Sequence, residues 1–384
     1  MNISPKPKKI IIGLVVFVGF YLASFATTYA ALGFLNQKEE VSLTPLADLK
    51  DITSQKPQSG DQPCPLNGVK FTKEQKEAWD QRRPLGVMIE NHVDARPQSG
   101  LSRADVVYEA VAEGGITRFL AMFYCQDAGD LTPVRSARMY YLEWLSEYGD
   151  HPLYAHVGGA NTPGPADALG TIRDLGWARE NDMDQFSLGF PTYWRGADRF
   201  APHNVHSTTQ KLWEAAKGRG YTEKDPQGKR WDENFSSWLF KDEAALDTRA
   251  ASASAQVNFW QGQGDYAVEW QYDKGANNYK RIQGGSVQKD ALTEEELTPK
   301  VVVVQFAKEL QVYDGYTADV HLSYKTTGSG DGVIFQNGKA EEVTWRKKDR
   351  EDRTRFFDVT GREIEFNRGQ IWIQVVPVGA EVKY

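Results

Sequence analysis

The longest apolar stretch lies near the start of the chain. Residues 10–35 read IIIGLVVFVGFYLASFATTYAALGFL and contain no charged side chain. Because about 20 such residues cross a bilayer as a helix, we expect a transmembrane helix over 10–35. Three lysines precede it, and Glu39 and Glu40 follow it, so residues 1–9 are expected to be cytoplasmic and 36–384 extracytoplasmic. A cleaved signal peptide is the alternative, although its apolar region is ordinarily shorter.

The pattern then changes three times. Residues 36–82 are rich in Lys, Glu, Gln, Pro and Ser, which is typical of a flexible tether. From 83 to 250, strand-like and helix-like stretches alternate and predict an α/β mixed-sheet domain. From 251 to 384, the apolar runs are short, β-branched or aromatic, and closed by glycine turns. This predicts a mostly antiparallel β sandwich or barrel, and an α+β fold class for the whole chain.

A hairpin is predicted over residues 106–124, turning on Gly114-Gly115. With these glycines as the two turn residues, the numbers of two paired residues add up to 229, so that Glu113 faces Ile116 and Glu109 faces Leu120. Glu109, Glu113 and Arg118 then share one face. Arg118 is then diagonal to both carboxylates, within reach of long side chains. Two interpretations stay open: an ion cluster that is purely structural, or side chains that serve a binding site.

The next segment, PVRSARMYYLEWLSEYG, predicts a helix from near Ser136 to Gly149. Arg135 and Arg138 then lie at its N-terminus, which carries partial positive charge and ordinarily prefers Asp or Glu. Two arginines there indicate an anionic partner. That partner is either an external phosphate or carboxylate group or an internal carboxylate, Glu109 or Glu113.

Further candidates lie in two loops that lead into predicted helices. A strand within LYAHVGGA carries His156 and ends at paired glycines, and strand ends of this kind bind ligands in α/β sheets. The second loop precedes a helix opened by the capping box at Ser207 and Gln210. Three histidines in these loops could bind a metal, yet they share no regular helix, and we expect neither a metal nor a cofactor. The candidate rim residues are His156, Gly158, Gly159, Arg195, Arg199, His203 and His206.

Composition excludes several classes of protein. The chain has 45 Lys+Arg against 52 Asp+Glu, a formal charge of −7, which argues against a general nucleic-acid binder. Its two cysteines exclude a disulfide-dense scaffold, and one bridge between Cys64 and Cys125 is expected if the chain is exported. Neither the G-x-S-x-G nor the P-loop spacing is present, so no particular enzyme is predicted.

The motifs EGGITRFLAMF, PVRSARMYYLEWL, HVGGA and APHNVHST, followed by YDKGANNYKRIQGG, GSGDGVIFQNGKAEEVTWRK and FNRGQIWIQVVP, resemble the YerB-like family of bacterial lipoproteins over about residues 83–384. The resemblance implies an extracytoplasmic envelope protein with two family domains of unknown function, the first α/β and the second mostly β. It brings no reaction and no catalytic residue. A lipid-accepting cysteine directly after the apolar stretch is missing, so a transmembrane helix is expected to replace the lipid as anchor.

Three hypotheses follow. The leading one is a membrane-anchored protein whose first domain binds an anionic or polar ligand, such as an envelope polymer or its precursor. Arg118, Arg135 and Arg138 would hold the anion, with Glu109 and Glu113 orienting them. The second is an enzyme acting on phosphate or pyrophosphate linkages, in which His156 or His203 moves a proton. The third is a non-catalytic scaffold that binds an unspecified protein partner through the β domain.

Overall fold

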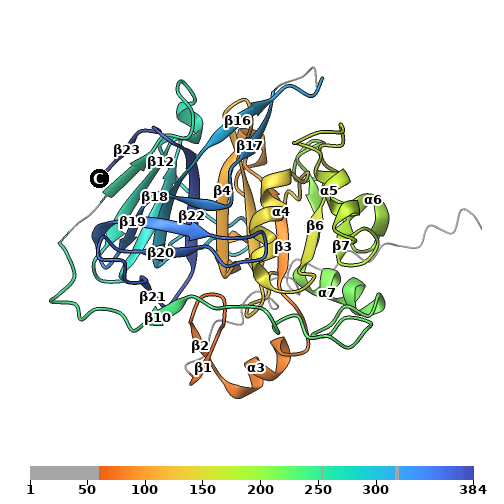
Figure 1. Cartoon of the computed structure of the whole chain (residues 1–384), viewed down its shortest axis with the longest axis horizontal. Coiled ribbons are helices and arrows are strands. Elements are labelled where there is room, and N and C mark those ends of the chain that lie inside the picture. Colours follow the sequence, from red (N-terminus) through yellow and green to blue (C-terminus); the bar gives the residue numbers. More distant parts are fainter. Residues whose placement is uncertain (1–59, 252–253, 316–319) are drawn as a thin grey trace, which may run out of the picture. The chain divides into compact units, whose positions relative to one another are not determined.

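The computed structural model describes residues 60–251, 254–315 and 320–384. The transmembrane helix expected over 10–35, the cytoplasmic stub and most of the tether lie outside these residues. Among the residues described, none of the helices combines the length and the apolar character that crossing a bilayer requires. The described part consists of mixed sheets with few helices and is mostly β (Figure 1).

One large sheet of ten strands runs through both halves of the chain. Its central strands, such as VVVVQF in β15, are apolar at consecutive positions because both faces of the sheet are covered. In order across the sheet, the strands are β20 (Arg355–Phe357), β19 (Lys339–Lys347), β18 (Gly328–Gln336), β15 (Val301–Ala307), β22 (Ile371–Pro377), β4 (Val106–Glu113), β5 (Ile116–Phe123), β3 (Leu85–Glu90), β6 (Leu153–His156) and β7 (Asp182–Asp184).

Strand β22 joins the two halves. It pairs in parallel with β15 on one side and with β4 on the other. Residues 251–384 pair mostly in antiparallel fashion, as predicted, but they do not form a separate sandwich or barrel, because part of this region extends the sheet of the first half. Alternation along the sequence cannot reveal which neighbour a strand takes, because a buried strand has the same apolar pattern in either arrangement.

A second sheet of five antiparallel strands belongs to the C-terminal half. Alternate positions of NYKRIQ in β13 are buried, as expected for a sheet with one face on the core. In order, its strands are β14 (Ser286–Val287), β13 (Asn278–Gln283), β12 (Val268–Asp273), β11 (Ser254–Val257) and β23 (Val382–Lys383). Four two-stranded sheets pair β1 (Gln62–Pro63) with β2 (Lys70–Phe71), β8 (Trp194–Arg195) with β9 (Val205–His206), β10 (Leu239–Lys241) with β21 (Glu365–Asn367), and β16 (Glu309–Val312) with β17 (His321–Tyr324).

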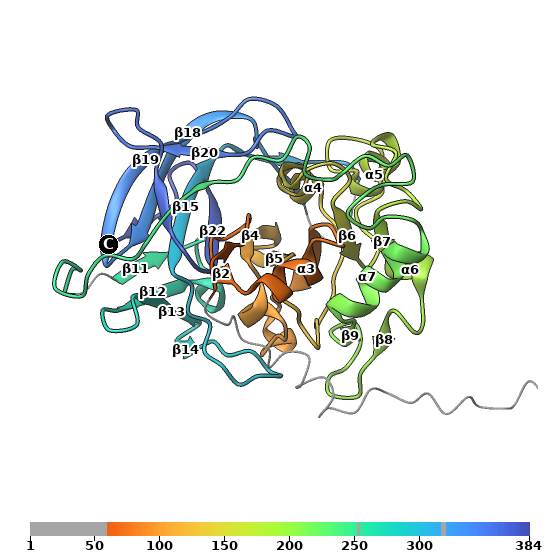
Figure 2. The same cartoon turned by 90° about the horizontal axis from the view of Figure 1, so that it is seen from below.

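Helices lie on both faces of the large sheet: α4 and α7 are on opposite sides of its strands (Figure 2). Helix α4 contacts the sheet directly: the Tyr140 hydroxyl donates to the Val111 carbonyl at 2.7 Å, and the Tyr141 hydroxyl to the Arg118 carbonyl at 2.6 Å. Within the described residues, the α-helices are α3 (Lys73–Trp79), α4 (Met139–Leu145), α5 (Ala168–Asp174), α6 (Gln185–Leu188) and α7 (Thr209–Gly218). The 3₁₀ turns are η1 (Val93–Ala95), η2 (Leu101–Arg103), η3 (Ser146–Tyr148) and η4 (Gly264–Tyr266).

Residues 60–82 differ from the expected tether. They form the β1–β2 hairpin and α3, which opens with a capping box between Thr72 and Gln75. Leu66, Phe71 and Trp79 are buried in the core. The composition of residues 60–82 predicted a flexible segment, but a few buried apolar side chains are enough to anchor a polar segment to the core.

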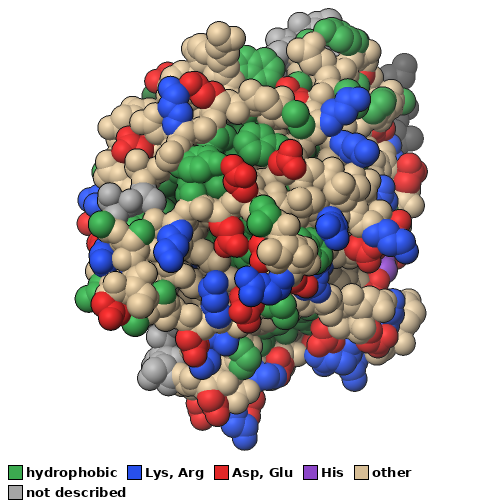
Figure 3. All heavy atoms as spheres, turned by 60° about the vertical axis from the view of Figure 1, so that its left-hand side comes forward, with side chains coloured by type: hydrophobic (Ala, Val, Ile, Leu, Met, Phe, Trp, Pro, Cys, Tyr) green, Lys and Arg blue, Asp and Glu red, His purple; other side chains and the backbone are tan. Residues whose placement is uncertain are grey.

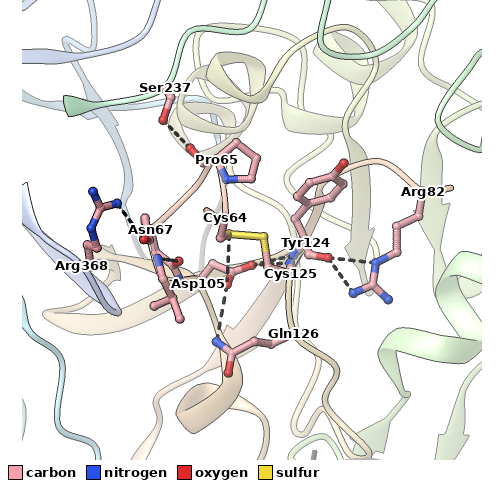
Figure 4. Close-up of a disulfide and its surroundings, with 12 residues drawn as sticks. Cys64, Pro65, Asn67, Arg82, Asp105, Tyr124, Cys125, Gln126, Ser237 and Arg368 are labelled. Carbon is pink, nitrogen blue, oxygen red and sulfur yellow. Dashed lines mark hydrogen bonds between the residues drawn. A yellow bond between two sulfur atoms is a disulfide. The ribbon is translucent and has the colours of Figure 1, made fainter. Parts of the chain in front are cut away.

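A disulfide joins this segment to the sheet. Cys64 and Cys125 are bonded, with their Cα atoms 6.0 Å apart, as expected for an exported chain (Figure 4). Asp105 lies beside the bridge and accepts hydrogen bonds from the backbone N–H groups of Tyr124 at 2.7 Å and Cys125 at 3.0 Å. The Asn67 side chain donates to the same carboxylate at 2.8 Å. The bridge thus fixes residues 60–82 to the end of β5.

Candidate functional site

The β4–β5 hairpin turns where expected but pairs in another register. Gly114 and Gly115 have φ of 55° and 80°, as a tight hairpin turn requires. Glu113 faces Ile116 as predicted, but the register shifts between Val111 and Glu113, so Glu109 faces Phe119 instead of Leu120. A shift of one residue reverses the face of a side chain, and Glu109 therefore lies on the opposite face from Arg118.

Glu109 is consequently not part of a site with the arginines. It is fully buried and forms an ion pair with Arg281 of β13, whose two terminal nitrogens donate at 2.9 and 2.7 Å. Trp372 Nε1 and Gln374 Nε2 each donate at 3.0 Å, and the Thr117 hydroxyl donates at 3.1 Å. This ion pair joins the two sheets, which corrects the predicted role of Glu109 in orienting a ligand-binding arginine.

The other candidates gather at one edge of the large sheet. Strands β3, β4, β6 and β7 run in the same direction, and their carboxyl ends share this edge, which we call the carboxyl edge. Strand β5 runs the other way and begins there, with Arg118 directly opposite Glu90 of β3. Ligands of α/β sheets bind beyond such edges.

Three arginines and two carboxylates form two sets of ion pairs at the carboxyl edge. Arg118 Nη2 lies 3.2 Å from Glu113, and Arg138 pairs with the other oxygen of the same carboxylate. Arg135 Nε lies 3.2 Å from Glu90 Oε1. We call these five residues the arginine cluster. The side chains of Arg118 and Arg138 are only 7% and 10% exposed, whereas that of Arg135 is 27% exposed, which makes Arg135 the most accessible cation of the cluster.

The helix after these arginines begins later than predicted. Helix α4 starts at Met139, with Arg138 as its N-cap, so Arg135 precedes the helix. Two backbone N–H groups before the helix are also in use: that of Arg135 donates to the Met88 carbonyl, and that of Ala137 donates to the Gly158 carbonyl. The argument from the helix dipole therefore applies to Arg138 and no longer to Arg135.

The glycine loop after β6 borders the arginine cluster through backbone pairing. Gly159 pairs with Ala137, and the Gly158 N–H donates to Asp184 Oδ1 at 2.8 Å. His156 is fully buried, with its ring nitrogens 2.9 Å from the Gly158 carbonyl and 2.7 Å from Asp182. Burial lowers the pKa of His156, but the neighbouring aspartates outweigh this effect and raise it overall. With both nitrogens engaged, His156 holds the loop and is poorly placed to move a proton.

Of the four candidates in the loop around residues 195–206, one reaches the arginine cluster. His203 Nδ1 lies 3.0 Å from Glu90 Oε2, opposite the side of the carboxylate that faces Arg135. Its ring stacks on that of His92, with centroids 4.9 Å apart. Glu90 and His92 were not among the site residues predicted from the sequence. Glu90 is the last residue of the strand LGVMIE, and His92 is the second residue after it.

The other three candidates lie outside the cluster. His206 is held between Asp130 at 2.8 Å and Asp198 at 3.0 Å, and these carboxylates raise its pKa against the lowering effect of burial. Arg199 pairs with Asp198 at 2.9 Å. Arg195 donates to the Asn204 side chain at 2.7 Å and borders a separate cavity of about 290 Å³. The histidines considered together for a metal, His156, His203 and His206, therefore have separate partners.

Elsewhere the surface carries mixed charge. On the side shown in Figure 3, Lys and Arg side chains alternate with Asp and Glu, around a group of exposed hydrophobic side chains. A cavity of about 400 Å³ on β18 and β19 is lined by apolar side chains such as Val343 and Tyr384, with Asp331 and Glu342 beside them.

Comparison with known proteins identifies the family. The model described as "Protein of unknown function (DUF3048) N-terminal domain" matches residues 71–222, and its C-terminal counterpart matches residues 255–373. The chain belongs to this two-domain family, which confirms the YerB-like resemblance of the motifs.

Two relatives are both YerB of Bacillus subtilis. "Putative lipoprotein YerB" from strain 168 is 32% identical over 318 residues, which cover 82% of this chain and 86% of the relative. The crystal structure of the YerB protein superposes with a TM-score of 0.68 and 27% identity, covering 84% of this chain and 99% of that structure. The fold described above is therefore that of a solved relative.

Proposed function

We propose that the chain is an extracytoplasmic protein of the bacterial cell envelope, held at the membrane by residues 10–35. The relative's name describes a lipoprotein, a class of membrane-attached envelope protein. The Cys64–Cys125 disulfide supports export, because such bonds persist in oxidising compartments. The apolar stretch over 10–35 is long enough for a single membrane crossing and would replace a lipid anchor.

We further propose that the arginine cluster binds an anionic group, a phosphate or carboxylate of an envelope polymer or its precursor. The observation that supports this proposal is the presence of three arginines at the carboxyl edge, each paired with Glu90 or Glu113. Guanidinium groups match the geometry of such oxyanions and form charge-assisted hydrogen bonds with them. Arg135 would make the first contact, because its side chain is the most exposed of the three.

In this proposal the two carboxylates position the cations. Glu113 contacts Arg118 and Arg138 together, so it restricts both guanidinium groups to one place. Glu90 does the same for Arg135, through an oxygen 3.2 Å from Nε. An arriving anion would then bind to N–H groups that are already oriented, which reduces the entropy lost on binding.

The test is binding of fluorescent poly(glycerol phosphate), an anionic polymer, to the detergent-solubilised full chain, with neutral dextran as the reference. Losing one charge-assisted contact should weaken binding by about 10-fold or more in the Arg135→Ala variant. Arg362→Ala is the matched control, because it removes one exposed arginine from the other half of the chain. Equal affinities of the two variants, or equal binding of dextran, would contradict the proposal.

A further inference from the structure

A second set of polar side chains lies directly beside the arginine cluster. His92, Asp94 and His203 each bring one potential ligand atom, and these three atoms all lie within 4.8 Å of one another. The two imidazole rings are stacked at 4.9 Å with an angle of 16° between their planes. The other four histidines of the chain are elsewhere: His156 and His206 contact the aspartates described above, His151 contacts Asp150 and His321 contacts Asp314.

Local backbone structure brings His92 and Asp94 together. His92 is the N-cap of η1, and its Nδ1 accepts a hydrogen bond from the Asp94 N–H at 3.2 Å. This turn places one carboxylate oxygen of Asp94 3.5 Å from the same ring nitrogen. The H-x-D spacing at the end of a buried strand therefore brings an imidazole and a carboxylate together. A metal bound at Nδ1 would replace the hydrogen bond from the Asp94 N–H, because one lone pair cannot serve both.

Glu90 fixes the third residue. A carboxylate only accepts hydrogen bonds, so His203 donates its Nδ1–H to Glu90 Oε2 at 3.0 Å. The lone pair of the ring is then on Nε2, where it can bind a metal. Carboxylates that orient metal-binding histidines in this way recur in metalloproteins. Glu90 Oε1 faces Arg135 at 3.2 Å, so the carboxylate lies between that cation and the histidine pair.

We propose that His92, Asp94 and His203 form a site for one divalent first-row transition metal ion of the Zn²⁺ class. Two imidazoles and one carboxylate form a donor set that binds such ions in preference to Mg²⁺ or Ca²⁺. Ligand atoms around tetrahedral zinc are about 3.4 Å apart, so the set must contract slightly on binding. Asp94 can move toward the ion, because its side chain is 70% exposed, and His92, which is 30% exposed, must also turn out of the stack so that both ring lone pairs point to the ion.

The chemical consequence concerns the neighbouring anion site. Three protein ligands leave a fourth position of a tetrahedral ion open to water or to an oxyanion. A divalent ion beside Arg135 would add positive charge at the carboxyl edge. The metal site does not rest on the proposed anion binding, because it is defined by its own ligands and is tested with the metal alone.

The experiment titrates Zn²⁺ into the metal-free, detergent-solubilised full chain by competition with a chromophoric chelator. Both cysteines are in the disulfide, so thiols do not compete for the metal. The variants are His92→Ala, His203→Ala and Glu90→Gln. His151→Ala is the matched control, because its side chain is 29% exposed, against 30% for His92, and also neighbours an aspartate. Thermal unfolding of each variant without metal verifies that it is folded.

We expect one Zn²⁺ per wild-type chain and per His151→Ala chain. Zinc binding should be at least 10-fold weaker in the His92→Ala and His203→Ala chains. Glu90→Gln should weaken binding by about 10-fold, as loss of an outer partner of a ligand does. Co²⁺ should give the visible absorption of a four-coordinate site in the wild type. Zinc affinity that is unchanged in folded His92→Ala and His203→Ala chains, or absent from the wild type, would overturn the proposal.

Discussion

The ion pair between Glu109 and Arg281 is expected to be the most sensitive polar contact between the two sheets. Arg281→Met removes the cation but keeps an apolar side chain of similar length against the aromatic rings, of which Trp372 is nearest, at 4.7 Å. Glu109 would then remain buried without its cation. Breaking a buried pair on one side destabilises a protein by about 3–5 kcal/mol.

The size of the expected thermal shift follows from the size of the folded part. An unfolding entropy of about 2.1 cal/mol/K per residue over roughly 320 residues gives about 0.7 kcal/mol/K. A loss of about 3–5 kcal/mol therefore lowers Tm by about 4–7 °C. Urea unfolding followed by tryptophan fluorescence measures the same loss as a shift of the midpoint.

Two further variants make this prediction specific. Arg346→Met changes an exposed arginine that lies over the Phe357 ring, and it should alter the stability by less than about 0.5 kcal/mol. The double variant Arg281→Met/Glu109→Gln removes the unpaired charge and should recover at least about 1 kcal/mol of the loss. The reasoning is refuted if Arg281→Met behaves like Arg346→Met, or if the two changes in the double variant simply add.

Two other predictions concern the disulfide and the carboxylate beside it. The bridge closes a loop across a sequence separation of 61, so its reduction should destabilise the chain by about 4 kcal/mol. Urea unfolding with and without reductant measures this loss, and coinciding midpoints would contradict the prediction. Burial raises the pKa of Asp105 from 3.8 to about 6, so the folded state retains the proton to higher pH than the unfolded state. Stability should therefore fall by about 2 kcal/mol, relative to Asp105→Asn, as the pH rises from about 4 to 7. Unfolding curves of both chains in which this difference stays constant would refute the prediction.

Much of the local structure could be predicted from the sequence. The hairpin over 106–124, the strand LGVMIEN and the Asn337-Gly338 turn all follow from short-range patterns that local physics determines. The register of the hairpin could not be predicted, because the bulge near Ala112 depends on how both faces of β4 are packed. Because of the one-residue shift at this bulge, Glu109 lies in the core and not at the predicted site.

The contacts of the candidate site could be predicted only in part, because they too depend on how distant segments pack. Arg118 and Arg138 share Glu113 as a partner, whereas Arg135 pairs with Glu90. Glu90 escaped notice because it ends a strand that otherwise reads as buried core. Contacts such as that between His203 and Glu90 join residues more than 100 positions apart and depend on the tertiary fold.

The most direct measurement of the central claim is a crystal structure of the folded chain soaked in tungstate, a heavy analogue of phosphate, with anomalous diffraction to locate the ion. The account predicts a tungstate ion within hydrogen-bonding distance of Arg135 and of at least one of Arg118 and Arg138. Tungstate bound only elsewhere on the molecule, with none beside the three guanidinium groups, would contradict it.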